Sequence, residues 1–132
     1  MQVFEQFRNV VSDDIDHLNH VNNIRYLDWI QAMARAHWTS LTSEKQRQEN
    51  VWVVLRHEID YKASAFLGDQ IHLKTYVTEC EGVTSIRVVE IYNAKTEKLL
   101  VKSKTKWCMT DPKTQRPKRI SEAIQTIFDE KV

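Results

Sequence analysis

Hydrophobic positions along the chain change from strand-like alternation to helical spacing and back again. Near the N-terminus, apolar residues at 3, 4, 7, 10 and 11 indicate a first strand, which a polar Ser-Asp-Asp triplet at 12–14 ends. From residue 22 to about residue 41, apolar side chains recur at steps of three and four, which predicts a helix. They are Ile24, Leu27, Ile30, Ala34, Trp38 and Leu41. Either Asn22 or Asn23 can cap the start of this helix.

The remaining chain contains four further strand-like segments and one short helix. A polar connection at 43–50 leads into strands at 51–61, 71–78, 83–92 and 99–109. Short turns separate the later segments, and this spacing favours antiparallel pairing between consecutive strands. Ser121 is placed to cap a short amphipathic helix, whose inward side chains are Ile124, Ile127 and Phe128.

The first predicted helix is apolar around most of its circumference, because Tyr26, Trp29, Met33 and Ala36 widen its apolar stripe. Such a helix needs other structure on nearly every side. A single sheet can surround it only by curling around it, which is the architecture of an α+β hotdog domain. The sequence therefore predicts one hotdog domain over residues 1–132, with about five antiparallel strands around a long central helix. Its exposed sheet edge and half-covered helix favour a homodimer or homotetramer.

Composition narrows the possible partners and compartments. The 132 residues carry 19 Lys and Arg against 18 Asp and Glu, so no overall charge favours nucleic acid or a membrane surface. Two cysteines are too few for a disulfide scaffold or a structural zinc site. No stretch of about 18 apolar residues occurs, and the N-terminus alternates instead of resembling a cleavable signal. We therefore expect a cytoplasmic protein without a metal or a cofactor.

Polar chemistry is concentrated between the first strand and the long helix. Residues 13–20 contain three carboxylates and two imidazoles, with two asparagines following them. One interpretation is turn and cap chemistry, which accounts for Asp13, Asn19 and Asn22. A metal site built from His17, His20 and a carboxylate is a second. The third is catalysis by a carboxylate, because the segment enters a helix N-terminus whose unpaired N–H groups suit a developing oxyanion.

The same segment carries a recognisable motif. Its residues closely resemble the D-x-D-x-x-x-H-V-N-N-x-x-Y signature of hotdog-fold acyl thioesterases, which include 4-hydroxybenzoyl-CoA thioesterase-like hydrolases and acyl-carrier-protein thioesterases. A second block at 59–69 looks like the I-D-Y-x-A-x-A-x-L-G-D segment of that family, preceded by an apolar run that ends in Arg56. Together the two blocks and the strand order extend the resemblance over nearly the whole chain.

The resemblance implies roles for individual residues. Asp16 matches the catalytic carboxylate, the backbone N–H of Asn23 matches the donor that polarises the thioester carbonyl, and His20 matches a positioning histidine. Tyr26 is either part of the acyl pocket or ordinary core. Four positions depart from the pattern, which leaves the substrate class and carrier recognition open. They are Leu18, Gln31, Ser64 and Phe66.

Basic residues are candidates for holding the coenzyme A phosphates, since Arg and Lys suit phosphate oxygens. Arg56 is one, and the others lie in a loop around Pro117, where they are equally explained as a solvated segment. These loop residues are Lys113, Arg116, Lys118 and Arg119.

Together with the candidate catalytic and basic residues, the resemblance implies hydrolysis of an acyl thioester, carried by CoA or by an acyl-carrier protein, in fatty acid metabolism. A thiolate leaves without a strong acid, and the chain contains no G-x-S-x-G nucleophile motif. Two alternatives stay open. An enoyl-thioester hydratase of the same fold uses an Asp/His pair, and a non-catalytic acyl-CoA-binding module needs no catalytic carboxylate.

Overall fold

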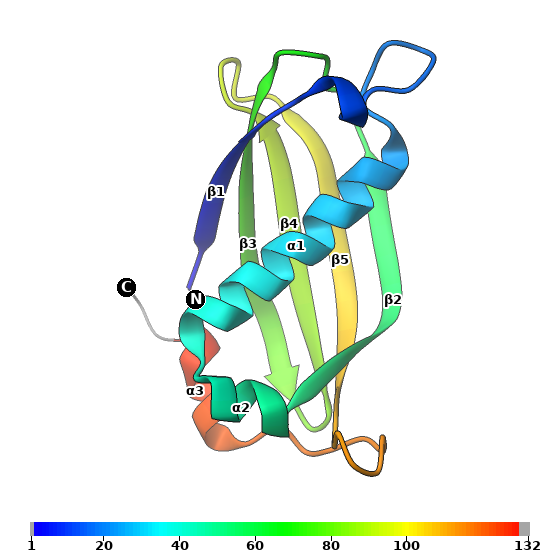
Figure 1. Cartoon of the computed structure of the whole chain (residues 1–132). Coiled ribbons are helices and arrows are strands. Elements are labelled where there is room, and N and C mark those ends of the chain that lie inside the picture. The colour runs from blue at the N-terminus through cyan, green and yellow to red at the C-terminus, as the bar shows by residue number, and fades with distance from the viewer. Residues whose placement is uncertain (1, 130–132) are drawn as a thin grey trace.

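The computed structural model describes residues 2–129, in which five antiparallel strands form one curled sheet and the long helix α1 crosses one of its faces (Figure 1). The strands are β1 (Phe4–Asn9), β2 (Val51–Tyr61), β3 (Gln70–Glu81), β4 (Thr84–Asn93) and β5 (Leu99–Thr110). The helices are α1 (Asn23–Leu41), α2 (Glu44–Glu49) and α3 (Glu122–Asp129), with one turn of 3-10 helix, η1 (Ser12–Asp14). The predicted curled sheet around a central helix, with a short C-terminal helix, is confirmed.

The strands do not all pair in chain order. The spatial order is β1-β3-β4-β5-β2, so β3, β4 and β5 form the predicted meander, but β2 pairs with β5 at one edge and β1 pairs with β3 at the other. The expectation that consecutive strands pair is therefore wrong for β2 and β3. Residues 62–69 connect the edge strand β2 to β3, which lies beside the other edge strand β1. Within this crossover, Ala65 is hydrogen-bonded to the start of α1. Its carbonyl accepts from the N–H of Val21 at 2.9 Å, and its N–H donates to the hydroxyl of Tyr26 at 2.9 Å.

Helix α1 buries a face shifted from the predicted one. Its buried residues are Tyr26, Trp29, Ile30, Met33, Ala34 and His37. Ile24, which was expected to begin the buried stripe, is 68% exposed because it lies on the outward face of the helix, which it shares with the exposed Asp28 and Arg35. One side of α1 therefore remains uncovered within a single chain.

The connection after α1 is more ordered than expected. Residues 43–50 were predicted as a solvated link, but six of them form the exposed helix α2. A capping box starts it, because the hydroxyl of Ser43 accepts from the N–H of Gln46 at 3.2 Å while the N–H of Ser43 donates to Oε1 of Gln46 at 2.9 Å. The S-x-x-Q spacing is the local signal for this helix.

The core lies between α1 and the sheet, as the alternation of β3 predicts. Ile71, Leu73, Thr75 and Val77 are all buried on one face of β3. A second apolar cluster forms around Met109 where α3 closes one end of the molecule with the predicted Ile124 and Phe128. Ile127, the third residue predicted to face inward, is only half-buried and lies outside this cluster. Within residues 2–129, no helix combines the length and apolarity that a membrane crossing requires.

Candidate active site

The polar segment between β1 and α1 folds into a tight loop that brings its two ends together. An isolated antiparallel bridge pairs Ile15 with Val21, and the N–H of Asp16 donates to the carbonyl of His20 at 3.0 Å. Asn19 takes a left-handed conformation with φ of 66°, which asparagine tolerates better than most residues. The loop therefore holds Asp16 on one side and leads directly into the first turn of α1 on the other.

Asp16 has one oxygen engaged and one directed toward an imidazole. Its Oδ1 accepts from the N–H of Leu18 at 2.8 Å, which fixes the side chain in the loop. Its Oδ2 lies 3.6 Å from Nδ1 of His20, and the two side chains are 19% and 31% exposed, respectively. Asp16 is thus a positioned carboxylate that a small molecule can still reach.

The carboxylate of Asp14, two residues earlier, has partners for both of its oxygens. Asp14 is buried, its Oδ2 accepts from the N–H of Val11 at 3.0 Å, and its Oδ1 lies 3.2 Å from Nε of Arg25. Both oxygens are therefore committed to holding the loop against α1. Of the two aspartates in the D-x-D pair, only Asp16 keeps an oxygen free of backbone and arginine partners.

The first backbone N–H groups of α1 differ in whether they have a hydrogen-bond acceptor. Asn22 is the N-cap residue, and its Oδ1 accepts from the N–H of Ile24 at 3.1 Å. The N–H of Arg25 donates to the carbonyl of Asn22 at 2.8 Å. No residue among 2–129 accepts from the N–H of Asn23, so this amide is an available donor at the positive end of the helix dipole.

Tyr26 does not form part of an open pocket. It is buried in the main core, its hydroxyl accepts from the N–H of Ala65, and its burial raises the pKa of the phenol. Of the two interpretations of Tyr26, the contacts support core packing and attachment of the 62–69 crossover.

The basic candidates lie away from Asp16 within one chain. Arg56 is exposed on the edge strand β2, where its Nη2 contacts the carboxylate of Glu58 at 2.7 Å. The loop after β5 carries Lys113, Arg116, Lys118 and Arg119, and it lies at the opposite end of the sheet from the start of α1 (Figure 1). Nζ of Lys118 donates to the carbonyl of Glu49, which ties this loop to α2. A single chain therefore does not bring these cations and Asp16 together.

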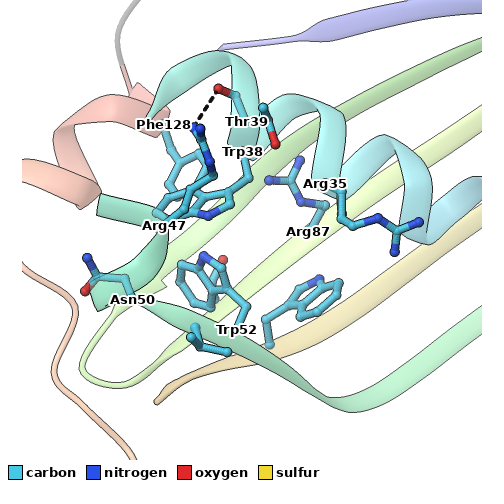
Figure 2. Close-up of a pocket in the computed structure, with 12 residues that line it drawn as sticks. Arg35, Trp38, Thr39, Arg47, Asn50, Trp52, Arg87 and Phe128 are labelled. Carbon is cyan, nitrogen blue, oxygen red and sulfur yellow. Dashed lines mark hydrogen bonds between the residues drawn. The ribbon is translucent and has the colours of Figure 1, made fainter. Parts of the chain in front are cut away.

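Two features were not identified from the sequence. Gln31, where the resembling family often has an acid, places Nε2 3.5 Å from Nε2 of His57, whose Nδ1 lies 2.9 Å from the hydroxyl of Thr105. A cavity lined by three tryptophans and three arginines lies near the other end of α1, and no residue of the 12–23 segment lines it (Figure 2). The alternation of β4 was the available signal for the cavity, since Arg87 shares the inward face of Val89 and Ile91.

Among residues 2–129, no three His, Cys, Asp or Glu side chains are grouped so that they could hold a metal ion. The polar loop instead presents one accessible carboxylate, one nearby imidazole and one unsatisfied helix amide. This set can polarise a carbonyl and direct a nucleophile or a base at its carbon.

Comparison with known families agrees with this chemistry. Residues 10–128 match the model of the thioesterase-like superfamily. The chain belongs to this superfamily. No curated protein gives a significant match.

Solved structures, two of them named thioesterases, share the hotdog fold of this superfamily member. A 1,4-dihydroxy-2-naphthoyl-CoA thioesterase from Synechocystis superposes with a TM-score of 0.85 at 18% identity, covering 97% of this chain and 96% of that one. A Staphylococcus aureus protein in complex with CoA superposes with a TM-score of 0.86 at 19% identity, covering 97% of this chain and 82% of that one. The 12:0-ACP thioesterase from Umbellularia californica superposes with a TM-score of 0.84 at 16% identity, covering 98% of this chain and 52% of the plant chain.

Proposed function

We propose that this protein hydrolyses acyl-CoA thioesters, with Asp16 as the catalytic carboxylate and the backbone N–H of Asn23 as the oxyanion donor. Membership of the thioesterase-like superfamily supports thioester hydrolysis as the general reaction. The observation that carries the proposal is the unsatisfied amide of Asn23 at the start of α1, directly after the loop that holds the reachable carboxylate of Asp16.

The proposed reaction needs few groups. The carbonyl oxygen of the thioester accepts from the N–H of Asn23, which increases the positive charge on the carbonyl carbon. Asp16 then either takes a proton from the attacking water or attacks the carbon itself to give a mixed anhydride that water cleaves. The C–S bond breaks in either route, and the thiolate leaves without a strong acid because its thiol has a pKa of about 8.5. The products are the free acid and the free thiol.

Coenzyme A is the preferred carrier in this proposal. Two similar structures are a CoA thioesterase and a complex with CoA, whereas the plant neighbour is named for an acyl-carrier protein. The cations that suit the CoA phosphates are Arg56, Lys113, Arg116, Lys118 and Arg119. Because the loop that carries four of them lies far from Asp16 within one chain, these residues are proposed to act from a second copy in a homo-oligomer.

His20 has a supporting role in this scheme. Its Nδ1 lies 3.6 Å from Asp16, close enough to limit the positions that the carboxylate can adopt. Tyr26 acts indirectly by attaching the 62–69 crossover to α1 through Ala65.

The amide of Asn23 can be tested separately from its side chain. Asn23→Pro removes the N–H at the first helical position, which proline tolerates, together with the side-chain amide, whereas Asn23→Ala removes the side-chain amide alone. Asn22 already has φ of −63° and ψ of 132°, the extended conformation that a following proline requires. We expect thiol release from acyl-CoA to fall by about 10²–10³-fold in Asn23→Pro and to stay near the wild-type rate in the matched Asn23→Ala variant. Equal rates in the two variants would remove the oxyanion role.

Asp16 is tested by Asp16→Asn, which keeps the acceptor for the N–H of Leu18 but removes the charge. Most turnover should disappear while the circular dichroism spectrum and the unfolding midpoint are retained. Near wild-type hydrolysis by the purified variant contradicts the assignment. A screen of acyl-CoA and acyl-carrier-protein substrates of different chain length then defines the substrate class.

The 3.6 Å approach of His20 to Asp16 keeps enoyl-thioester hydration as the second candidate function. Loss of enoyl absorbance without release of thiol would favour the hydratase. Tight binding of acyl-CoA with neither reaction would favour a binding module.

A further inference from the structure

An open cavity of about 300 Å³ lies beside the C-terminal half of α1, lined by residues of α1, α2, β2, β4, β5 and α3 (Figure 2). Its walls are largely aromatic. The rings of Trp38 and Trp52 meet edge to face with centroids 5.8 Å apart, and Phe128 stacks on Trp38 at 5.9 Å. Trp107 lines the cavity as well. Such walls suit a ring or a short alkyl chain.

The charged residues around this cavity all have the same sign. Arg35, Arg47 and Arg87 line it, and no Asp or Glu is among its twelve lining residues. None of the three arginines forms an ion pair with a carboxylate within residues 2–129. Arg47 instead donates to backbone carbonyls of Thr39 and Thr42. The cavity therefore offers donors and positive charge to whatever occupies it.

Arg87 is the most unusual of these residues, since only 5% of it is exposed. Its Nη1 lies 2.9 Å from Nδ1 of His37 and 3.0 Å from the hydroxyl of Thr75. The hydroxyl of Thr75 donates to the carbonyl of Val88, so its oxygen accepts from Arg87. A buried guanidinium is normally paired with an anion, but these partners carry no negative charge.

His37 does not supply that charge. Because Nδ1 accepts from Arg87, Nε2 carries the proton and donates to Oε1 of Gln2 at 3.1 Å, so the ring is neutral. Burial together with the charge of Arg87 lowers the pKa of His37 to about 4, which keeps it neutral at physiological pH. The positive charge of Arg87 therefore has no counter-ion among the described residues.

A second donor around the cavity lacks a partner. Nε1 of Trp107 is buried and forms no hydrogen bond within residues 2–129. Because an indole N–H can only donate, the group that satisfies it must be an acceptor. The ligand that suits these features is an apolar molecule with an anionic, oxygen-bearing end. Its apolar part matches the aromatic walls, and its anionic end matches the buried guanidinium and the unpaired indole N–H.

We propose that this cavity binds a small carboxylate with an apolar body, whose carboxylate pairs with Arg87 and whose body packs against Trp38, Trp52 and Trp107. At about 30 Å³ for each water molecule, the volume corresponds to roughly ten waters, and so to a ligand of roughly ten non-hydrogen atoms. The site is distinct from the proposed active site. Ala34 is the lining residue closest to the start of α1, and it lies eleven residues after Asn23, about 16 Å along the helix.

The test uses tryptophan fluorescence of the full chain, because three of its four tryptophans line the cavity. Phenylacetate and octanoate, each with ten non-hydrogen atoms, are titrated beside phenylacetamide, the uncharged counterpart of phenylacetate. At least one acid should change the fluorescence saturably. Phenylacetamide, or octanamide if octanoate is the ligand, should bind at least tenfold more weakly. The proposal is overturned if neither acid saturates, or if the amide binds as tightly as its acid. This comparison needs no variant.

Variants then locate the site. Arg87→Met should weaken binding of the carboxylate at least tenfold, and Trp107→Phe should weaken it by a smaller factor while preserving the ring. Asp16→Asn should leave binding unchanged, because Asp16 does not contact the cavity. Unchanged affinity in a folded Arg87→Met variant, or loss of binding in Asp16→Asn, places the ligand elsewhere and refutes the proposal. If Arg87→Met does not fold, Trp107→Phe decides in its place.

Discussion

Nε of Arg25 lies 3.2 Å from Oδ1 of Asp14, so the first turn of α1 is tied to the loop that carries Asp16. The same guanidinium donates through Nη2 to the carbonyl of Asp13 at 2.9 Å. Arg25 thus connects the helix that presents the amide of Asn23 to the loop that presents Asp16, the proposed catalytic carboxylate. Its effect on the proposed chemistry is indirect, through the relative position of the two groups.

Replacing Arg25 should therefore affect hydrolysis more than stability. In Arg25→Ala, the buried Asp14 keeps the N–H of Val11 but loses its cationic partner. Because the arginine side chain is 40% exposed, we expect a loss of only about 1 kcal/mol in the free energy of unfolding. The turnover number should fall by a factor that corresponds to more than this loss of stability. Urea unfolding and thiol-release kinetics measure the two quantities.

The matched control for Arg25→Ala is Arg35→Ala, on an exposed part of the same helix and without an ion pair in residues 2–129. It should change neither quantity appreciably. If Arg25→Ala hydrolyses acyl-CoA as fast as Arg35→Ala does, the loop does not need this tether.

Tyr26→Phe should destabilise the crossover between β2 and β3. The change removes the oxygen that accepts from the buried N–H of Ala65 and leaves that amide without its partner. We expect the free energy of unfolding to fall by about 1–3 kcal/mol, the usual cost of an unsatisfied buried donor. Tyr61→Phe is the matched control, because Tyr61 is half-exposed and its hydroxyl forms no hydrogen bond within residues 2–129. Equal urea midpoints for the two variants would contradict the proposed role of the Tyr26 hydroxyl.

Local patterns in the sequence were enough to predict most of the elements. The alternation at Ile71, Leu73, Thr75 and Val77 identified the inner face of β3, because side chains on a strand alternate between its two faces. The pairing order could not be predicted in the same way. It consists of pairings between residues far apart in the chain, such as Phe4 with Thr75 and Val51 with Thr110.

The candidate site shows the same difference between local and long-range information. Asp16 and Asn23 belong to one short motif, so the sequence could bring them together. The aromatic cavity is assembled from six elements, and none of its residues is unusual within its own segment. The only local signal for Arg87 is its position in β4. It shares the inward face with Val89, so its charge is buried.

The neutral, buried His37 predicts a specific dependence of stability on pH. Its pKa is about 4 in the folded chain and 6.5 in its ordinary state, so between these values the unfolded chain binds a proton that the folded chain does not. The free energy of unfolding should therefore rise with pH across this window, by at most about 3 kcal/mol from this residue. The gain is complete above pH 6.5 and absent below about pH 4.

His37→Gln isolates this contribution from those of other titrating groups. A glutamine can accept from Arg87 through its oxygen and donate to Gln2 through its nitrogen, but it does not titrate. The difference in free energy of unfolding between wild type and variant should change between pH 4.5 and pH 7, when measured by urea titration. A constant difference would show that folding does not lower the pKa of His37.

The edge strand β2 predicts how copies of the chain associate. Val51, Val53 and Leu55 are 38%, 42% and 56% exposed along an eleven-residue strand that is paired only with β5. A long apolar edge with unpaired backbone groups favours pairing with a second copy. Sedimentation velocity should therefore show a dimer or a larger assembly for the wild type and a monomer for the Val53→Lys/Leu55→Lys double variant.

Because the CoA-binding cations are proposed to come from a second copy, the KM for acyl-CoA should rise in the same variant. Phe7→Lys on the other edge strand β1, where Phe7 is also exposed, is the control and should leave the assembly intact. A wild-type chain that sediments as a monomer while hydrolysing acyl-CoA would show that the active site is complete without a second copy.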